Sequence, residues 1–182
     1  MKVGIAQRTS DSLARHQIKE FAMKNESNDM LDYKQVVEEK VKFLDAHNYM
    51  SLATALNDLV TVRTLTYVND GLNIYFITDQ HSKKCAQITA NPRVSACIDN
   101  VQIIGKAEVL GKPLDEENKE YADIYCRKLP DIFKQYSSIP VMLLVRLTPV
   151  LFETWVRTPS RQYLEHFDPE NRKAYVFKEL GK

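Results

Sequence analysis

The chain has 182 residues, a length that suits one domain with short extensions. Its 25 basic and 24 acidic residues leave a net charge of +1, so it has no bulk electrostatic attraction to nucleic acid. No run approaches the ~20 apolar residues of a membrane span, and the polar N-terminus does not resemble a secretory signal. Three scattered cysteines, none spaced as CxxC, argue against a disulfide framework and predict free thiols in the cytoplasm.

Hydrophobic patterning divides the chain into three segments. We expect an N-terminal extension over residues 1–28, a domain over 29–160 and a C-terminal tail over 161–182. Asp32, followed three residues later by Gln35, is typical of a helix N-terminus. Apolar residues at helical spacing then predict a helix over residues 33–46.

From residue 49 the hydrophobic period changes to two, which is the period of a half-buried strand. Asn69-Asp70-Gly71 is a strong hairpin signal and predicts an antiparallel meander over residues 49–78. Gly105 predicts a bulge within a later strand. The expected strands cover 49–56, 59–68, 72–78, 93–99, 101–110, 141–147, 149–156 and a short 172–177. Two further helices are expected over 82–90 and 114–128. Residues 157–171 are expected to form a polar loop.

Six or seven antiparallel strands with helices between them predict a mainly β protein, a closed or split β-barrel. The chain lacks the short signatures of serine hydrolases, zinc proteases, P-loop proteins and dinucleotide-binding proteins. Its four histidines, His16, His47, His81 and His166, are scattered and do not pair with other ligands, so we expect no metal site.

An anion site is the most informative chemical prediction from the residues themselves. Ser82-Lys83-Lys84 follows a predicted strand and opens a helix, where free backbone N–H groups attract anions. Two lysines at that end oppose the helix dipole unless an anion lies between them, although both could equally be solvated surface residues. Arg63, in the middle of a β-branched strand, strengthens the phosphate interpretation, because a strand arginine usually needs a partner. The single tryptophan, Trp155, packs either in the core or against a flat cofactor.

These features also occur in the order of a known family. Arg63 in the second strand is followed by Thr-x-x-x-Ser-Lys-Lys at 78–84, Asn-Pro-Arg-Val-Ser at 91–95, Ile-Gly-Lys-Ala-Glu-Val at 104–109 and Leu-Thr-Pro-x-x-x-Glu-x-Trp at 147–155. Over residues 31–157 the chain resembles the pyridoxamine 5′-phosphate oxidase-like family of FMN-binding split barrels. The resemblance implies a six-stranded antiparallel split barrel and a homodimer with one FMN per subunit at the interface.

The resemblance also assigns candidate cofactor-binding residues. It gives Arg63, Ser82, Lys83 and Lys84 to the phosphate, with Lys83 in place of the usual arginine. It places six further candidates along or beside the flavin: Thr64, Leu65, Thr66, Ile77, Thr78 and Trp155. Asn100 would reach the flavin that the partner subunit binds.

Two departures separate the chain from the vitamin-forming oxidases. Val68 stands where those enzymes carry a lysine, and Gln162-Tyr163-Leu164-Glu165 follows Arg161 where they carry a substrate histidine and a second arginine. We therefore predict that the chain is not an efficient pyridoxamine phosphate oxidase. Each missing charge-assisted bond would cost the substrate ~1.5–3 kcal/mol.

The resulting hypothesis is an FMN-dependent oxidoreductase whose substrate and electron donor are unassigned, with no identifiable catalytic side chain. Three alternatives remain open: a non-catalytic flavin-binding or stress-related protein, the same fold with haem or a deazaflavin, or a dimer without a ligand. Haem would need an axial ligand, for which only His166 is available.

Overall fold

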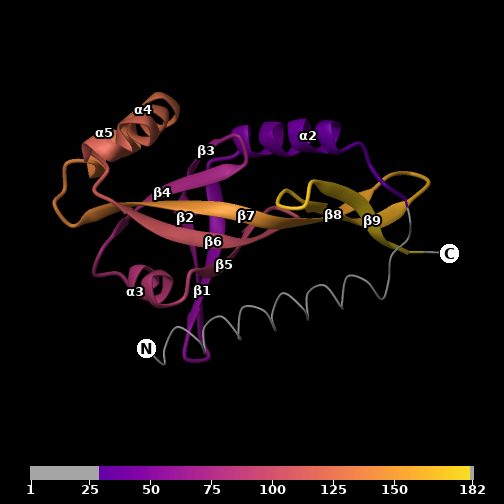
Figure 1. The fold of residues 1–182 in the computed structure, drawn as a ribbon, viewed down its shortest axis with the longest axis horizontal. Coiled ribbons are helices and arrows are strands. Elements are labelled where there is room, and N and C mark those ends of the chain that lie inside the picture. The colour runs from indigo at the N-terminus through magenta and orange to yellow at the C-terminus, as the bar shows by residue number, and fades with distance from the viewer. Residues whose placement is uncertain (1–28, 181–182) are drawn as a thin grey trace.

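The computed structural model describes residues 29–180, so the predicted extension over 1–28 lies outside the described residues. Nine strands form one antiparallel sheet with the order β2-β1-β5-β6-β7-β4-β3, and β8 and β9 continue it from β7. Figure 1 shows α2 above this curved sheet, α3 below it and the β8–β9 hairpin at one end. The mainly antiparallel β fold predicted from the sequence is confirmed, with nine strands in an open sheet instead of six.

The strands follow the hydrophobic alternation closely at the start of the domain. They cover β1 (Tyr49–Leu56), β2 (Leu59–Thr66), β3 (Val68–Asp70), β4 (Asn73–Asp79), β5 (Arg93–Ile98), β6 (Val101–Gly111), β7 (Met142–Arg157), β8 (Gln162–Asp168) and β9 (Lys173–Leu180). Met50, Leu52 and Thr54 alternate on the buried face of β1, as their spacing predicts. The inner sides of these strands pack into a continuous core with one face of α2.

The helices are α2 (Tyr33–Asp45), α3 (Lys83–Ala90), the 3₁₀ turn η1 (Glu116–Asn118), α4 (Lys119–Lys128) and α5 (Pro130–Tyr136). The Asp32 side chain accepts a 2.8 Å hydrogen bond from the Gln35 backbone N–H, which confirms the predicted N-cap of α2. Ser82 caps α3 in the same way by accepting from the Cys85 N–H at 3.3 Å. Pro130 begins α5, one residue after α4 ends at Lys128.

The predicted three-strand meander is wrong. The second strand ends at Thr66, and the separate strand β3 makes the hairpin with β4. Within residues 29–180, strand β2 pairs only with β1, whereas β4 pairs with β7, more than sixty residues further along the chain. Gly71 has a φ of 53° in the β3–β4 turn, the left-handed conformation that glycine adopts without strain.

Strand β7 replaces two predicted strands, because it continues through Pro149 for 16 residues. The register between β6 and β7 shifts at Gly105, which lies opposite Pro149, and this bulge accommodates the missing proline N–H. A Cβ at Gly105 would lie 2.7 Å from the Thr148 carbonyl oxygen, so only glycine allows this close approach.

The expected polar loop over residues 157–171 is also wrong, because Gln162–Asp168 within it forms β8. This strand pairs with the second half of β7 on one side and with β9 on the other. Glu165, His166 and Phe167 in its centre are all buried. The C-terminal segment therefore extends the same sheet.

Candidate functional site

Arg63 projects from β2 into a polar cluster at the α3 end of the sheet. Its guanidinium donates to the Leu52 carbonyl oxygen at 3.1 Å, to Thr54 Oγ1 at 2.7 Å and to Thr61 Oγ1. Partial burial lowers the pKa of the guanidinium, although an arginine remains charged at any ordinary pH. The strand arginine does have partners, as predicted, but all three are neutral oxygens.

Gln87 links α3 to this cluster, and the sequence analysis did not identify it. Its Oε1 accepts from Thr54 Oγ1 at 2.6 Å and from Thr61 Oγ1 at 2.7 Å, while its Nε2 donates to the Leu59 carbonyl oxygen at 3.1 Å. The side chain is 3% exposed. A buried glutamine with its acceptor and a donor both used fixes α3 against the β1–β2 hairpin. The signal in the sequence is a polar residue on the buried face of a short helix.

The start of α3 completes the cluster. The hydroxyls of Thr78, at the end of β4, and Ser82 lie 3.3 Å apart. Lys84 lies in the first turn of α3, where burial and the positive charge of Arg63 both lower its pKa. Lys83 is exposed. The structure thus brings Arg63, Thr78, Ser82 and Lys84 together and leaves Lys83 at the outer surface.

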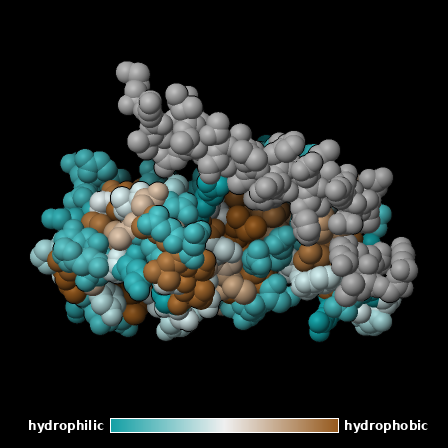
Figure 2. All heavy atoms as spheres, turned by 90° about the horizontal axis from the view of Figure 1, so that it is seen from below, coloured by the Kyte–Doolittle hydropathy of each residue, from teal (hydrophilic) through white to brown (hydrophobic). Residues whose placement is uncertain are grey.

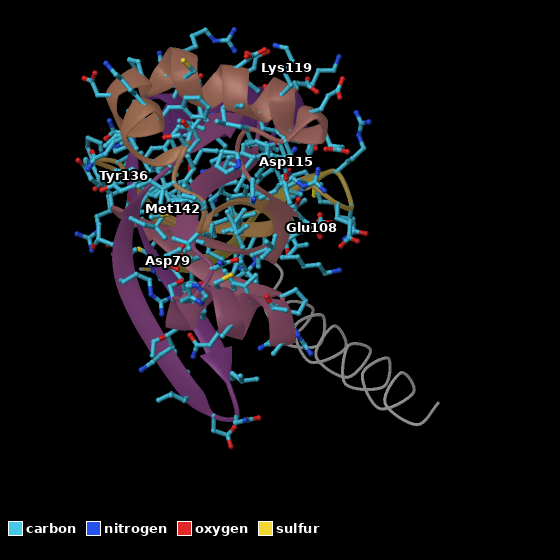
Figure 3. The ribbon with its side chains drawn as sticks, turned by 90° about the vertical axis from the view of Figure 1, so that its left-hand side faces the viewer. Asp79, Glu108, Asp115, Lys119, Tyr136 and Met142 are labelled. Atoms are coloured by element: carbon cyan, nitrogen blue, oxygen red, sulfur yellow. The ribbon has the colours of Figure 1, made fainter. Side chains whose placement is uncertain are left out.

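This arrangement fits a phosphate group. Two cations near enough to depress a lysine pKa destabilise each other, and an anion between them would remove that repulsion. The capped N-terminus of α3 and the Ser82 hydroxyl supply further hydrogen-bonding groups. Figure 3 labels Asp79 and Met142, paired residues that mark the end of the sheet from which the chain enters α3.

The flavin-lining candidates lie on the strands next to this cluster. Thr64 is exposed on the outer side of β2, and Leu65 packs against the core. Thr66 and Ile77 both lie near Tyr125 of α4. Burial raises the pKa of Tyr125, which is 1% exposed. The sequence analysis missed Tyr125, because nothing in the helical pattern of α4 indicated contact with β2 and β4.

Asn100 and Trp155 meet each other, in a different part of the fold. The Asn100 side chain, in the β5–β6 turn, donates to the Trp155 carbonyl oxygen at 2.8 Å. Trp155 is half-buried near the end of β7, which lies four strands from β2 along the sheet. A single chain therefore has two separate groups of candidate residues.

The histidines that the structure describes are engaged in other contacts. His166 Nε2 lies 2.8 Å from a carboxylate oxygen of Glu153, and its ring stacks on Phe177 with centroids 4.1 Å apart. The His47 ring nitrogens contact the Phe43 carbonyl oxygen at 2.7 Å and Asp99 at 3.1 Å. Within residues 29–180, no group of three or more His, Cys, Asp or Glu side chains could hold a metal ion.

Comparison with known proteins decides the family. The family model described as pyridoxamine 5′-phosphate oxidase matches residues 36–156, about two thirds of the chain. The chain belongs to the pyridoxamine 5′-phosphate oxidase-like family. A search of curated proteins found none that matches this chain.

Solved structures similar to this family member show the same fold. A pyridoxamine 5′-phosphate oxidase-related, FMN-binding protein from Nostoc punctiforme is 16% identical, with a TM-score of 0.54, covering 84% of this chain and 99% of its own. HutZ, described as a haem storage protein from Vibrio cholerae, is 15% identical, with a TM-score of 0.53, covering 62% of this chain and 89% of its own. ChuZ from Campylobacter jejuni is 15% identical, with a TM-score of 0.65, covering 80% of this chain and 64% of its own.

The departures of this pyridoxamine 5′-phosphate oxidase-like chain from the vitamin-forming enzymes are visible in the structure. Val68 is buried in β3. The Arg161 guanidinium lies 2.7 Å from Asp29 and stacks over the Tyr163 ring, so it already has two partners. Among residues 29–180, no helix is both long and apolar enough to span a membrane.

Proposed function

We propose that this protein binds FMN and acts as a flavin-dependent oxidoreductase. The observation that carries the proposal is the position of Lys84 in the first turn of α3 beside Arg63, because two cations at a helix N-terminus favour an anion such as the FMN phosphate. Arg63, Ser82 and Lys84 would hold the phosphate, with Lys83 at the rim. Family membership and the FMN-binding neighbour from Nostoc punctiforme support the same cofactor.

The strands beside the cluster would position the ring system. Thr64, Leu65 and Thr66 on β2, with Ile77 and Thr78 at the end of β4, offer backbone groups along one path leading from the phosphate cluster. Buried Tyr125 lies beside Thr66 and Ile77 and would support both strands from the α4 side. A bound flavin supplies the electron-transfer chemistry, while the protein supplies orientation, electrostatics and exclusion of water.

A homodimer would unite the two groups of candidate residues. Asn100 and Trp155 would then contact the flavin held by the partner subunit. An exposed apolar strip supports this arrangement: Tyr49, Leu59, Val60 and Val62 on β1 and β2 are each more than half exposed. Figure 2, viewed from below, shows brown hydrophobic residues gathered among polar ones on the α3 side of the molecule.

Haem is the weaker candidate, although HutZ is among the structural neighbours. An axial ligand needs a ring nitrogen that is free to coordinate the metal. His166 has 4% of its side chain exposed and is held by Glu153 and Phe177. This packing argues against coordination of haem iron by His166.

The test is the visible absorption spectrum of the purified protein, before and after addition of FMN and removal of the excess. We expect flavin bands that are lost in Arg63→Ala and Lys84→Ala and retained in Lys42→Ala, an exposed control lysine on α2. No bands in the wild type would contradict FMN binding, and a Soret band would favour haem. Reduction of the bound flavin by NAD(P)H separates an oxidoreductase from a flavin carrier.

A further inference from the structure

The side-chain amide of Gln87 has only one orientation that suits its surroundings. One end of the amide lies 3.1 Å from the Leu59 carbonyl oxygen, which can only accept a hydrogen bond, so this end is the nitrogen Nε2. The amide oxygen Oε1 therefore faces β1 and β2, where it lies 2.6 Å from Thr54 Oγ1 and 2.7 Å from Thr61 Oγ1. Because a carbonyl oxygen only accepts, both threonine hydroxyls donate their hydrogen to Gln87.

The direction of these two bonds decides what the hydroxyls offer to Arg63. A hydroxyl has one hydrogen and two lone pairs, so Thr54 and Thr61 can only accept from a further group. Arg63 supplies the matching donors, since Nη1 donates to Thr54 Oγ1 at 2.7 Å and Nη2 donates to Thr61 Oγ1. Arg63, Thr54, Gln87 and Thr61 thus close a ring of four hydrogen bonds, which we call the Arg63 ring.

The Arg63 ring occupies one side of the guanidinium and leaves another side available. A guanidinium has five N–H groups, of which Nη1 uses two, on Thr54 and on the Leu52 carbonyl oxygen, and Nη2 uses one on Thr61. The two threonine oxygens lie 3.5 Å apart, which suits parallel bonds from the ends of Nη1 and Nη2. Among residues 29–180, no hydrogen-bond partner takes the Nε–H or the second N–H of Nη2. These two N–H groups are neighbours that point the same way.

The Arg63 ring fixes the guanidinium without neutralising it. Every oxygen that Arg63 contacts is uncharged. Gln87 and Thr54 are only 3% and 1% exposed, and a satisfied buried network of this kind is rigid. The positive charge therefore remains, and it is presented through two parallel N–H groups. Such a pair matches two oxygens of a phosphate, which an arginine binds through two bonds at once.

We propose that Thr54, Thr61 and Gln87 position Arg63 for a two-bond contact with a phosphate monoester, and that this contact makes the site prefer FMN to riboflavin. The inference rests on the proposed function and deepens it. Thr54, Thr61 and Gln87 are positioning residues, because they act on the phosphate through Arg63. When the ring is broken the guanidinium rotates, so the phosphate loses a bond while the flavin ring system keeps its contacts.

Fluorescence titration of the full-length protein with FMN and with riboflavin tests the positioning role. Thr61→Val removes the hydroxyl and keeps the branched shape, Thr61→Ser keeps the hydroxyl, and Thr148→Val makes the control change at an exposed position on β7. We expect Thr61→Val to weaken FMN binding about tenfold and riboflavin binding by less than about twofold, because only FMN carries the phosphate. Thr61→Ser and Thr148→Val should match the wild type. An equal loss for both flavins in Thr61→Val, or a serine variant as weak as the valine variant, would overturn the proposal.

The ligand-free protein gives a second readout that needs no flavin. NMR of the isotope-labelled protein reports rotation of the Arg63 guanidinium, and Arg63→Lys, which lacks the guanidinium, assigns its signals. We expect separate Nη1 and Nη2 signals in the wild type, Thr61→Ser and Thr148→Val, and one averaged signal in Thr61→Val. An averaged signal in the wild type would refute the Arg63 ring. A wild type that binds no FMN would refute the proposed function, and the guanidinium signals would still decide the ring.

Discussion

The two ends of the sheet bury charge in opposite ways. At the α3 end, Arg63 and Lys84 are like charges, and burial together with the charge of Arg63 lowers the pKa of Lys84. Under α2, Lys40 and Glu165 are opposite charges in contact at 2.5 Å. The first group holds two cations side by side with Asp79 as a nearby counter-charge, whereas each charge of the second group directly contacts the other. The comparison teaches that the like charges at the α3 end favour a bound anion, whereas the opposite charges under α2 neutralise each other without a ligand.

The largest expected effect comes from breaking the balanced pair. Lys40→Met leaves Glu165 buried without its counter-charge, which should lower the free energy of unfolding by about 3–5 kcal/mol. The double variant Lys40→Met/Glu165→Leu should recover most of that loss, because no charge is then buried alone. Urea denaturation measures both variants. A single variant as stable as the wild type would contradict the burial of this pair.

Removing one cation from the cluster at the α3 end should weaken ligand binding without lowering the stability of the ligand-free protein. Lys84→Met should weaken FMN binding about 10- to 100-fold, as expected for the loss of one charge-assisted bond of ~1.5–3 kcal/mol. The same change should leave the ligand-free protein at least as stable, since Arg63 loses a repulsive neighbour. Fluorescence titration with FMN and a thermal melt of the apoprotein give the two values. A large loss of apoprotein stability would show that Lys84 is structural.

The support behind the cluster can be tested through Gln87. Gln87→Leu removes the acceptor shared by Thr54 and Thr61 and frees α3 from the Leu59 carbonyl. We expect a loss of about 1–3 kcal/mol in stability, with weaker FMN binding as a secondary effect. Gln135→Leu, at an exposed position on α5, is the matched control. Unchanged stability in urea would mean that α3 is held by other contacts.

The smallest expected effect is a pH dependence of stability at the cationic cluster. Because the folded protein lowers the pKa of Lys84 below the ordinary lysine value of 10.5, the unfolded chain binds more protons in the pH range between the two pKa values. Stability from this residue therefore rises as the pH rises through that window. The stability advantage of Lys84→Met over the wild type should therefore shrink as the pH rises. Paired thermal melts at increasing pH would show this. An advantage that grows with pH has the wrong sign for this explanation.

Local signals in the sequence were sufficient for the helices and for part of the site. The caps at Asp32 and Ser82 depend on residues within one turn, so they predicted α2 and α3 directly. Arg63, Ser82 and Lys84 were predicted because charge and helix position are readable from the chain. The meander failed because the partner of β4 is β7, and no local pattern specifies a partner so distant.

The missed features all depend on contacts between distant segments. Residues 157–171 look polar in the sequence alone, yet β8 buries Glu165 against Lys40 and His166 against Glu153. Pro149 suggested a break between two strands, but the bulge at Gly105 allows β7 to continue. Gln87 and Tyr125 gained significance only once α3 and α4 were placed against β2. Most of the fold could be predicted, whereas the residues that support the site could not.

The unbroken β7 has a consequence for the shape of the protein in solution. At ~3.3 Å per residue, its 16 residues span about 50 Å. A compact globule of this chain length has a radius of gyration of only about 16 Å and a diameter of roughly 40 Å. Figure 1 shows β7 running along the long axis, with the β8–β9 hairpin at one end. The described part of the molecule is therefore elongated, and it should diffuse more slowly than a sphere of equal mass.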